Sequence, residues 1–136
     1  MLLLRHARAL ERYGWEGDDR LRPLDAKGES QAAALVELLA TYPLDRIVTS
    51  PALRCTATVA PLARARGLEA EIREELAEEG HWQEGAALVR SLAGADAVVC
   101  GHGGLEHAVL ADPPRWKKGA VLVLDEALGV VESFRP

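Results

Sequence analysis

Short apolar runs alternate with longer amphipathic stretches along this chain, and this alternation is typical of an α/β protein. The first run, Leu2 to Leu4, is too short for a helix and predicts a buried strand. Three later runs predict further strands, at residues 46–49, 68–73 and 97–100. Residues 121–125 and 130–134 flank Leu128-Gly129 and predict a β-hairpin.

The stretches between the strands carry the start and stop signals of helices. Asp25 is a suitable N-cap for a helix that ends before Pro43. This helix is expected to direct a set of apolar side chains toward the core: Ala32, Leu35, Val36, Leu38 and Leu39. Residues 83–93 and 105–110 predict two further helices, whereas the charged, glycine-containing segment 7–22 predicts a loop.

Another helix is expected to begin at Ser50-Pro51. Serine is a favoured N-cap, and proline suits the first helical position because the backbone N–H that it lacks has no partner there. The helix should run to Gly67, which is a suitable C-cap. Pro61 lies inside it and is expected to kink or split it.

These elements predict an α/β three-layer sandwich with a mainly parallel central sheet, helices on both faces and an antiparallel edge. The length of 136 residues fits one compact domain, which we expect to span residues 1–136. Hydrophobic residues make up 49% of the chain, enough for a core without disulfides or metal ions. Cys55 and Cys100 form no ligand cluster and are expected to remain reduced thiols.

The charge and the apolar runs limit the classes of partner. A net charge of −5 argues against broad binding of nucleic acids, so an anionic substrate would need a local cationic site. The apolar start is interrupted at Arg5-His6, well before the length of a signal peptide core, and no run reaches the ~18 apolar residues of a membrane helix. We therefore expect a cytoplasmic monomer that binds neither nucleic acid nor a membrane.

Basic residues follow three of the predicted strands. Arg5 and His6 follow the first strand, Arg54 lies in the first helical turn after the second, and His102 follows the strand 97–100. Because ligands bind at the carboxyl ends of parallel strands, these side chains should meet at one edge of the sheet. Each residue alone also fits an ordinary structural role, but their convergence favours a binding site for an anion.

Two histidines and two arginines at one edge are suited to phosphoryl transfer. A neutral imidazole is a good nucleophile toward phosphorus, and water can remove the phosphoryl group from the phosphohistidine that forms. Guanidinium groups bind phosphoryl oxygens through their fork of N–H donors, and a helix N-terminus also favours anions. These residues are thus suited to a phosphatase that uses an imidazole as its nucleophile, with His6 beside Arg5 as the candidate.

Three motifs, in their order along the chain, resemble the histidine phosphatase (phosphoglycerate mutase-like) superfamily. They are Leu4-Arg5-His6-Ala7, the helix start Ser50-x-x-x-Arg54-x-x-x-Thr58, and Cys100-Gly101-His102-Gly103. The pattern Asp19-x-x-Arg22-Pro23-Leu24, followed by Lys27-Gly28, is similar to the short SixA-type phosphohistidine phosphatases. The resemblance covers nearly the whole chain.

The resemblance implies that His6 becomes phosphorylated and that Arg5, Arg54 and His102 bind the phosphoryl group. His102 would then be cationic in the transition state, where charge stabilisation matters most. The substrate would be a phosphohistidine protein or a small phosphomonoester. We expect no cofactor and no metal ion, since no His/Asp spacing suggests a metal pair.

The resemblance also suggests a proton donor for the leaving group. Glu78 matches best the position of the acid in larger family members, with Glu75 and Glu79 as alternatives, whereas SixA-type enzymes lack a clear acid. An imidazole can leave already protonated on its other nitrogen, but an alcohol needs the proton. Whether the reaction needs Glu78 as a proton donor therefore depends on which substrate the enzyme uses. His81, in the same loop, could reach the mouth of the site.

Two other functions fit the same residues. A phosphoglycerate mutase-like phosphotransferase would need a lid, and the short segments between Arg54 and His102 favour an open site for hydrolysis instead. A non-catalytic phosphate-binding module would have lost turnover, although all four core positions are occupied. A cysteine phosphatase is excluded because no arginine stands six positions after Cys55 or Cys100.

Overall fold

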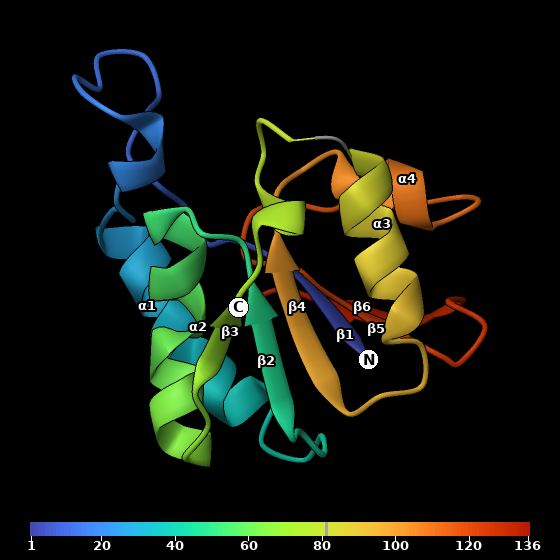
Figure 1. The fold of residues 1–136 in the computed structure, drawn as a ribbon. Helices are drawn as coiled ribbons and strands as arrows, with labels where there is room; N and C mark the ends of the chain where they lie inside the picture. Colours follow the sequence, from blue (N-terminus) through green and yellow to red (C-terminus); the bar gives the residue numbers. More distant parts are fainter. Residues whose placement is uncertain (81) are drawn as a thin grey trace.

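The computed structural model describes residues 1–80 and 82–136, and Figure 1 shows the order of its helices and strands. Position 81 lies outside the described residues, so the prediction that His81 could reach the mouth of the site falls there. Within the described residues, no helix combines the length and the apolar character needed to cross a lipid bilayer.

Strands in the described part of the chain form one six-stranded sheet in the order β3-β2-β4-β1-β5-β6. The strands are β1 (Leu2–Arg5), β2 (Arg46–Thr49), β3 (Ala70–Ile72), β4 (Ala97–Gly101), β5 (Val121–Leu124) and β6 (Val130–Phe134). Strands β1 to β4 pair in parallel, whereas β5 and β6 add an antiparallel edge. The predicted mainly parallel sheet and the predicted terminal hairpin are confirmed.

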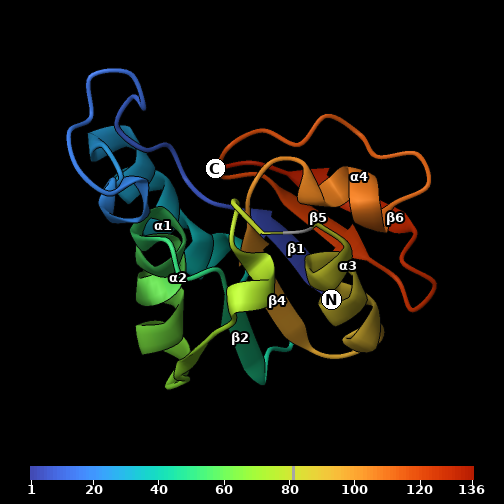
Figure 2. The same ribbon diagram turned by 45° about the horizontal axis from the view of Figure 1, so that its top comes forward.

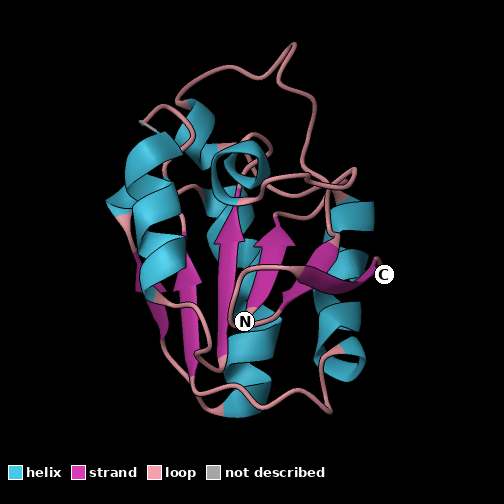
Figure 3. Ribbon diagram, turned by 90° about the vertical axis from the view of Figure 1, so that its right-hand side faces the viewer, coloured by secondary structure: helices cyan, strands magenta, loops and turns pink. Residues whose placement is uncertain are grey.

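Helices cover both faces of this sheet, as Figure 3 shows from the side. Helices α1 (Ala26–Leu38) and α2 (Leu53–Arg66) pack on one face, and α3 (Trp82–Ser91) and α4 (Leu105–Val109) pack on the other. Two short 3-10 helices, η1 (Asp19–Leu21) and η2 (Glu74–Leu76), precede α1 and α3. The three predicted layers are therefore present, and η1 lies within the segment predicted as a loop.

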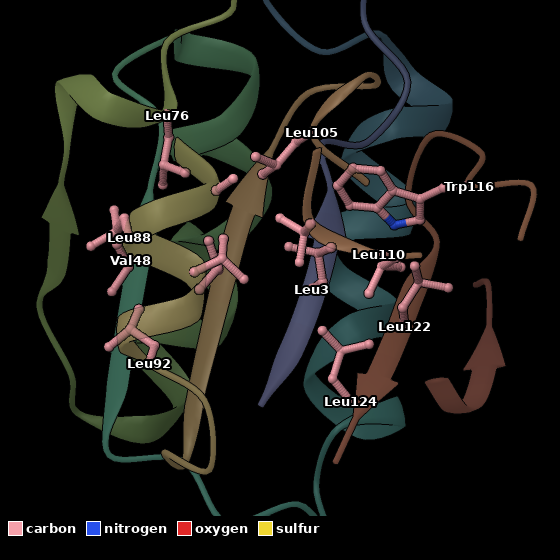
Figure 4. Packing of buried hydrophobic residues seen from close by; sticks show 14 of the residues in the cluster. Leu3, Val48, Leu76, Leu88, Leu92, Leu105, Leu110, Trp116, Leu122 and Leu124 are labelled. Atoms are coloured by element: carbon pink, nitrogen blue, oxygen red, sulfur yellow. The ribbon is translucent and has the colours of Figure 1, made fainter. Parts of the chain in front are cut away.

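Two hydrophobic cores form because successive side chains of a strand point to opposite faces of the sheet. In β1, Leu3 packs on the α3 and α4 side, whereas Leu2 and Leu4 pack on the α1 and α2 side. Figure 4 shows the first of these cores, in which Trp116 closes one end. Burying each such leucine contributes about 1.5–3 kcal/mol, which fixes the register of β1 at the centre of the sheet.

Helix α1 begins as predicted at Asp25, whose carboxylate accepts a hydrogen bond of 2.8 Å from the backbone N–H of Gly28. A Cβ atom at Gly28 would lie 1.8 Å from the carbonyl oxygen of Arg8, so glycine lets this helix start pack directly on the loop after β1. Two of the residues predicted to face the core do not join it: Leu38 is 42% exposed and Val36 is only partly buried. Leu39, the C-cap that follows α1, is buried as predicted.

Helix α2 begins later than predicted, three residues after Ser50. Ala52 is its N-cap and has no polar side chain to make a capping bond, while the hydroxyl of Ser50 accepts from the backbone N–H of Ala52 at 3.3 Å and contacts the ring of His102. Pro61 does not split the helix, which continues past it to Gly67. Gly67 has a positive φ of 64°, so the predicted C-cap is confirmed.

The carboxyl ends of β1, β4 and β2 lie side by side at the edge of the sheet that Figure 2 turns toward the viewer. The register pairs Arg5 with Gly101 and Thr49 with Cys100. The residues that follow each strand are thus delivered to one place, although they lie far apart in the sequence.

Candidate active site

Two imidazole rings form the centre of the site. His6 follows β1 and His102 follows β4, and their ring centroids lie 5.4 Å apart with an interplanar angle of 62°. The rings are buried, with exposed fractions of 4% for His6 and 0% for His102. The backbone N–H of His6 donates to the carbonyl oxygen of Gly101 at 3.0 Å, so the two strand ends are joined directly beneath the rings.

The hydrogen bonding of His6 identifies the nitrogen that can attack phosphorus. Its Nδ1 lies 2.8 Å from the carbonyl oxygen of Ala7, which can only accept, so Nδ1 carries the proton and Nε2 keeps the lone pair. Burial lowers the pKa of His6 to about 3, and the nearby charges of His102, Arg54 and Arg5 act in the same direction. The ring is therefore neutral near pH 7, as a nucleophile must be.

Arg54, the second residue of α2, supplies a buried guanidinium group. Its Nη1 donates to the carbonyl oxygen of Asp19 at 2.8 Å, and its Nη2 lies 3.2 Å from Oε1 of Glu78. The hydroxyl of Thr58 donates to the carbonyl oxygen of Arg54 and accepts from the backbone N–H of Ala7 at 2.9 Å. Thr58 therefore joins the first turns of α2 to the loop that carries His6.

Arg5 approaches the site from the end of β1. Its Nη1 donates to the carbonyl oxygen of Trp116 at 2.7 Å. A Cβ atom at Gly103 would lie 2.8 Å from Cζ of Arg5, so glycine is what allows the guanidinium to lie against this backbone. Burial lowers the pKa of Arg5, and the carboxylates of Glu106 and Glu78 partly offset this effect.

His102 is held through its Nε2 atom. The hydroxyl oxygen of Ser50 lies 2.7 Å from this nitrogen, and the sulfur of Cys55 lies 3.6 Å from it. The Ser50 hydroxyl can donate to Nε2 of the neutral ring or accept from the imidazolium, so it supports both charge states. The other nitrogen, Nδ1, lies 3.8 Å from Oε2 of Glu78.

Buried nitrogen atoms without partners surround His6. Across residues 1–80 and 82–136, the buried side-chain nitrogens with no hydrogen-bond partner are Arg5 Nε, Arg54 Nε, His102 Nδ1 and Gln31 Nε2. Three of these four belong to the residues whose charges lower the pKa of His6. An unsatisfied buried polar group costs about 1–3 kcal/mol, and a ligand rich in acceptor oxygens would remove that cost. The arrangement fits a tetrahedral oxyanion next to His6.

The structure describes all three candidate carboxylates for the proton donor. Of these, Glu78 is the one that contacts this pocket. Its Oε1 accepts from Nη2 of Arg54 and from Nη2 of Arg12, while its Oε2 approaches His102. Its side chain is 29% exposed, so it lies at the mouth of the site.

The other two candidate carboxylates lie in separate ion pairs. Glu75 pairs with Arg73, whose hydrogen bond lowers the pKa of this carboxyl. Glu79 pairs with Arg20, and a hydrogen bond from its own backbone N–H, together with that arginine, lowers its pKa. Glu75 and Glu79 are thus engaged with arginines outside the pocket, although the charge of His102 also acts on Glu79.

Two contributions to the site were missed by the sequence reasoning. Ser50 was interpreted as a helix cap, although its hydroxyl orients His102. Asp19 was noted as part of a motif but given no role, and its Oδ2 lies 3.2 Å from Nη2 of Arg54. Partial burial raises the pKa of Asp19, but the hydrogen bond from Arg22 and the charge of Arg54 outweigh it and hold the pKa below its usual range. The serine in the helix-start motif and the Asp19-x-x-Arg22 spacing were the available signals.

The functional groups that line the site are imidazole, guanidinium and carboxylate groups. In the described portion of the chain, no group of three His, Cys, Asp or Glu side chains could hold a metal ion. His107 is exposed on α4, and Arg8 pairs with Asp25 at 2.5 Å, so both lie outside the pocket.

Known proteins with similar sequences and structures share this architecture. Residues 1–87 match the family model described as histidine phosphatase superfamily (branch 1). A structure of the protein histidine phosphatase SixA complexed with tungstate is 22% identical, with a TM-score of 0.80, and the match covers 98% of this chain and 95% of that one. The putative phosphohistidine phosphatase SixA from Agrobacterium tumefaciens is 25% identical, with a TM-score of 0.83 over 99% of this chain and 96% of that one.

A curated relative carries a different substrate name. The 8-oxo-(d)GTP phosphatase of Mycolicibacterium smegmatis is 41% identical over 64 residues, which are 47% of this chain. The match spans only 20% of the length of that relative. The family model covers more than half of this chain, and the matched residues include His6 and Arg54, whereas His102 lies beyond them. The chain therefore belongs to the histidine phosphatase superfamily and has the fold of the SixA-type structures.

Proposed function

We propose that this phosphatase hydrolyses its substrate in two steps through a phosphohistidine on Nε2 of His6. One observation carries the proposal: the neutral, buried imidazole of His6 lies among three buried nitrogens that lack acceptors, on Arg5, Arg54 and His102. A phosphoryl group would supply those acceptors and would place its phosphorus within reach of the lone pair of His6.

In the first step, Nε2 of His6 attacks the phosphorus while the bond to the leaving group breaks and the leaving atom keeps the electron pair. Arg5, Arg54 and the imidazolium of His102 stabilise the charge that spreads over the equatorial oxygens. In the second step, water attacks the phosphorus, loses a proton, and the P–N bond breaks. Phosphate leaves, and His6 regains its lone pair.

The preferred substrate in this proposal is a phosphohistidine protein. Its leaving group is an imidazole, which needs no proton from the enzyme if its other nitrogen is already protonated. This suits a site whose nearest carboxylate, Glu78, is ion-paired with both Arg12 and Arg54. The names of the SixA structures support the same substrate class.

For an oxygen ester, the proposed proton donor is Glu78. Its carboxylate lies at the mouth of the site and contacts both Arg54 and His102. An alkoxide is a poor leaving group, so its departure should depend strongly on that proton.

A second candidate is a nucleotide substrate, which the name of the Mycolicibacterium smegmatis relative favours. Its leaving group is a phosphate, which departs more easily than an alkoxide and depends less on an acid.

The test is a panel of substrates: a phosphohistidine protein, an alkyl phosphate and 8-oxo-dGTP. The parent should release phosphate from the phosphohistidine protein, and Glu78→Gln should lower the ratio of the alkyl phosphate rate to the phosphohistidine rate by about 10²-fold. Glu79→Gln is the matched control, because Glu79 lies in the same loop but pairs with Arg20.

Three results would redirect the proposal. Turnover of 8-oxo-dGTP without turnover of the phosphohistidine protein would move the substrate class to nucleotides. Transfer of the phosphoryl group between hydroxyls of phosphoglycerate, with little free phosphate, would identify a mutase. Binding of phosphate with no turnover of any substrate would leave a non-catalytic module.

A further inference from the structure

A second cationic cleft lies beside the phosphoryl pocket. It has a volume of about 420 Å³ and is walled by α4, by the loop 113–118 and by the end of the chain. Its lining includes six basic side chains: Arg5, His107, Arg115, Lys117, Lys118 and Arg135. This concentration of positive charge stands out in a chain whose net charge is −5.

The cations of this cleft outnumber its carboxylates, although Glu106 lies 3.5 Å from Nε2 of His107 and its charge also acts on Arg5. Within the described residues, the five Lys and Arg side chains of the cleft form no ion pair, whereas arginines at the other mouth of the site, such as Arg12 and Arg20, do. Glu106 is the one carboxylate in the described lining, and it is 6% exposed. Its Oε2 accepts a hydrogen bond of 2.7 Å from the backbone N–H of Gly104, so it caps its own helix start.

Arg5 belongs to both sites. Its Nε is buried without a partner in the pocket of His6, and its Nη1 donates to the carbonyl oxygen of Trp116 in the wall of the cleft. The contact with Gly103 holds the guanidinium against the backbone next to His102. Arg5 therefore borders both the phosphoryl pocket and the cationic cleft.

We propose that this cleft binds a second phosphate of the substrate, joined to the reacting phosphoryl group through one bridging oxygen. This inference concerns the second candidate of the proposed function, the nucleotide substrate: a small phosphoanhydride, such as a nucleoside diphosphate or triphosphate. The inference rests on the proposed function and extends it by assigning a leaving-group subsite to Arg115, Lys117 and their neighbours.

The chemistry of the leaving group supports this assignment. When Nε2 of His6 attacks the terminal phosphorus, the bond to the bridging oxygen breaks and the departing phosphate keeps the electron pair. The negative charge that develops on this phosphate lies next to Arg5 and the cleft, where cations stabilise it most directly. Water then hydrolyses the phosphohistidine as in the proposed function, so each turnover releases one phosphate and one shortened product.

The kinetic test compares ADP with p-nitrophenyl phosphate, which lacks a second phosphate. In the double variant Arg115→Ala/Lys117→Ala, the ratio of kcat/KM for ADP to kcat/KM for the aryl phosphate should fall about tenfold or more. The control Lys27→Ala/Arg64→Ala removes one lysine and one arginine that are exposed and lie outside the cleft, and it should keep the parent ratio.

A binding test separates this inference from the proposed function. Methylenediphosphonate, which cannot be hydrolysed, should bind the parent more tightly than methylphosphonate in calorimetry, and the double variant should lose this preference. Equal affinity of the two compounds for the parent would overturn the inference even if the protein turns over aryl phosphates. A double variant that loses only activity on a phosphohistidine protein would also overturn it, in favour of an acidic protein surface in the cleft. Failure of the proposed function would appear differently, as aryl phosphate hydrolysis that survives His6→Ala.

Discussion

Arg54 and Arg12 both contact the carboxylate of Glu78, yet they lie in opposite environments. The side chain of Arg54 is 1% exposed and that of Arg12 is 62% exposed. An exposed ion pair contributes about 0–1 kcal/mol, because water and salt screen it. A buried guanidinium with an unpaired Nε is costly to keep without an anion. Both arginines are close to the same carboxylate, so proximity alone does not identify an arginine that binds a ligand. Burial and a hydrogen-bond donor without a partner identify it.

The largest expected effect follows from removing the buried arginine, Arg54. Arg54→Ala should lower kcat/KM by about 10²–10³-fold, because a preorganised donor to the transition state is lost. Arg54→Lys should recover part of the rate, since it restores the charge without the planar fork. Steady-state kinetics on an aryl phosphate measures both.

A binding measurement checks the same claim without catalysis. Inorganic phosphate should raise the Tm of the parent and not that of Arg54→Ala. A parental rate and a parental phosphate shift in Arg54→Ala would show that this guanidinium does not bind the phosphoryl group.

A smaller effect is expected from Ser50, which acts through His102. Ser50→Ala removes the hydroxyl 2.7 Å from Nε2 of His102 and should lower kcat about tenfold by loosening the ring. Ser50→Thr, which restores a hydroxyl at this position, should recover most of the lost kcat, and KM should change little in either variant. A loss that appears mainly in KM, or that Ser50→Thr does not restore, would indicate a merely structural role for Ser50.

The sequence was sufficient to predict the sheet and the convergence of His6, Arg54 and His102. The apolar runs at β1 and β4 are too short for helices, so a buried strand is the structure that they favour. In a parallel sheet the carboxyl ends of the strands lie at the same edge, and this brings the residues that follow them together. Ser50 was misinterpreted because Ser-Pro is also a strong helix-start signal, and only the folded neighbour His102 decides between the two roles. The exposed Leu38 was misplaced because the pattern at a helix end does not report how the last turn is oriented.

Other parts of the site have no periodic signal. The three candidate carboxylates, Glu75, Glu78 and Glu79, lie in or next to the short helix η2, where no regular pattern fixes their direction. Which of them approaches Arg54 and His102 depends on tertiary packing, and the local sequence does not report that packing. The cationic cleft is also formed by irregular backbone around Arg115, by Arg5 and by the chain end, which only the tertiary structure brings together.

The burial of His6 should also appear in the dependence of stability on pH. Its pKa is lowered from 6.5 to about 3 by folding, so the unfolded chain binds the extra proton and stability is lost as the pH falls from about 6.5 toward 3. The loss is at most about 1.4 kcal/mol per pH unit for one proton. His6→Asn, whose amide can still donate to the carbonyl of Ala7, should lose correspondingly less. Urea unfolding at pH 7, 5 and 4 makes the comparison, and parallel curves for the two proteins would contradict it.

The smallest effect is expected for the exposed arginine, Arg12. Arg12→Ala should change kcat/KM by less than about threefold and the free energy of unfolding by less than about 1 kcal/mol, because its pair with Glu78 is open to solvent. Kinetics and denaturant unfolding test both values. A loss as large as that of Arg54→Ala would mean that the mouth of the site, and not its buried floor, binds the substrate.

If His6 itself carries the phosphoryl group, the covalent intermediate can be trapped on this residue. The parent should be mixed with a phosphorylated substrate, quenched within the first turnover under alkaline conditions, and analysed by peptide mass spectrometry. The account predicts one acid-labile phosphoryl group on His6, and none in His6→Ala. Turnover by the parent with no phosphoryl group on His6, or with the group on another residue, would contradict it.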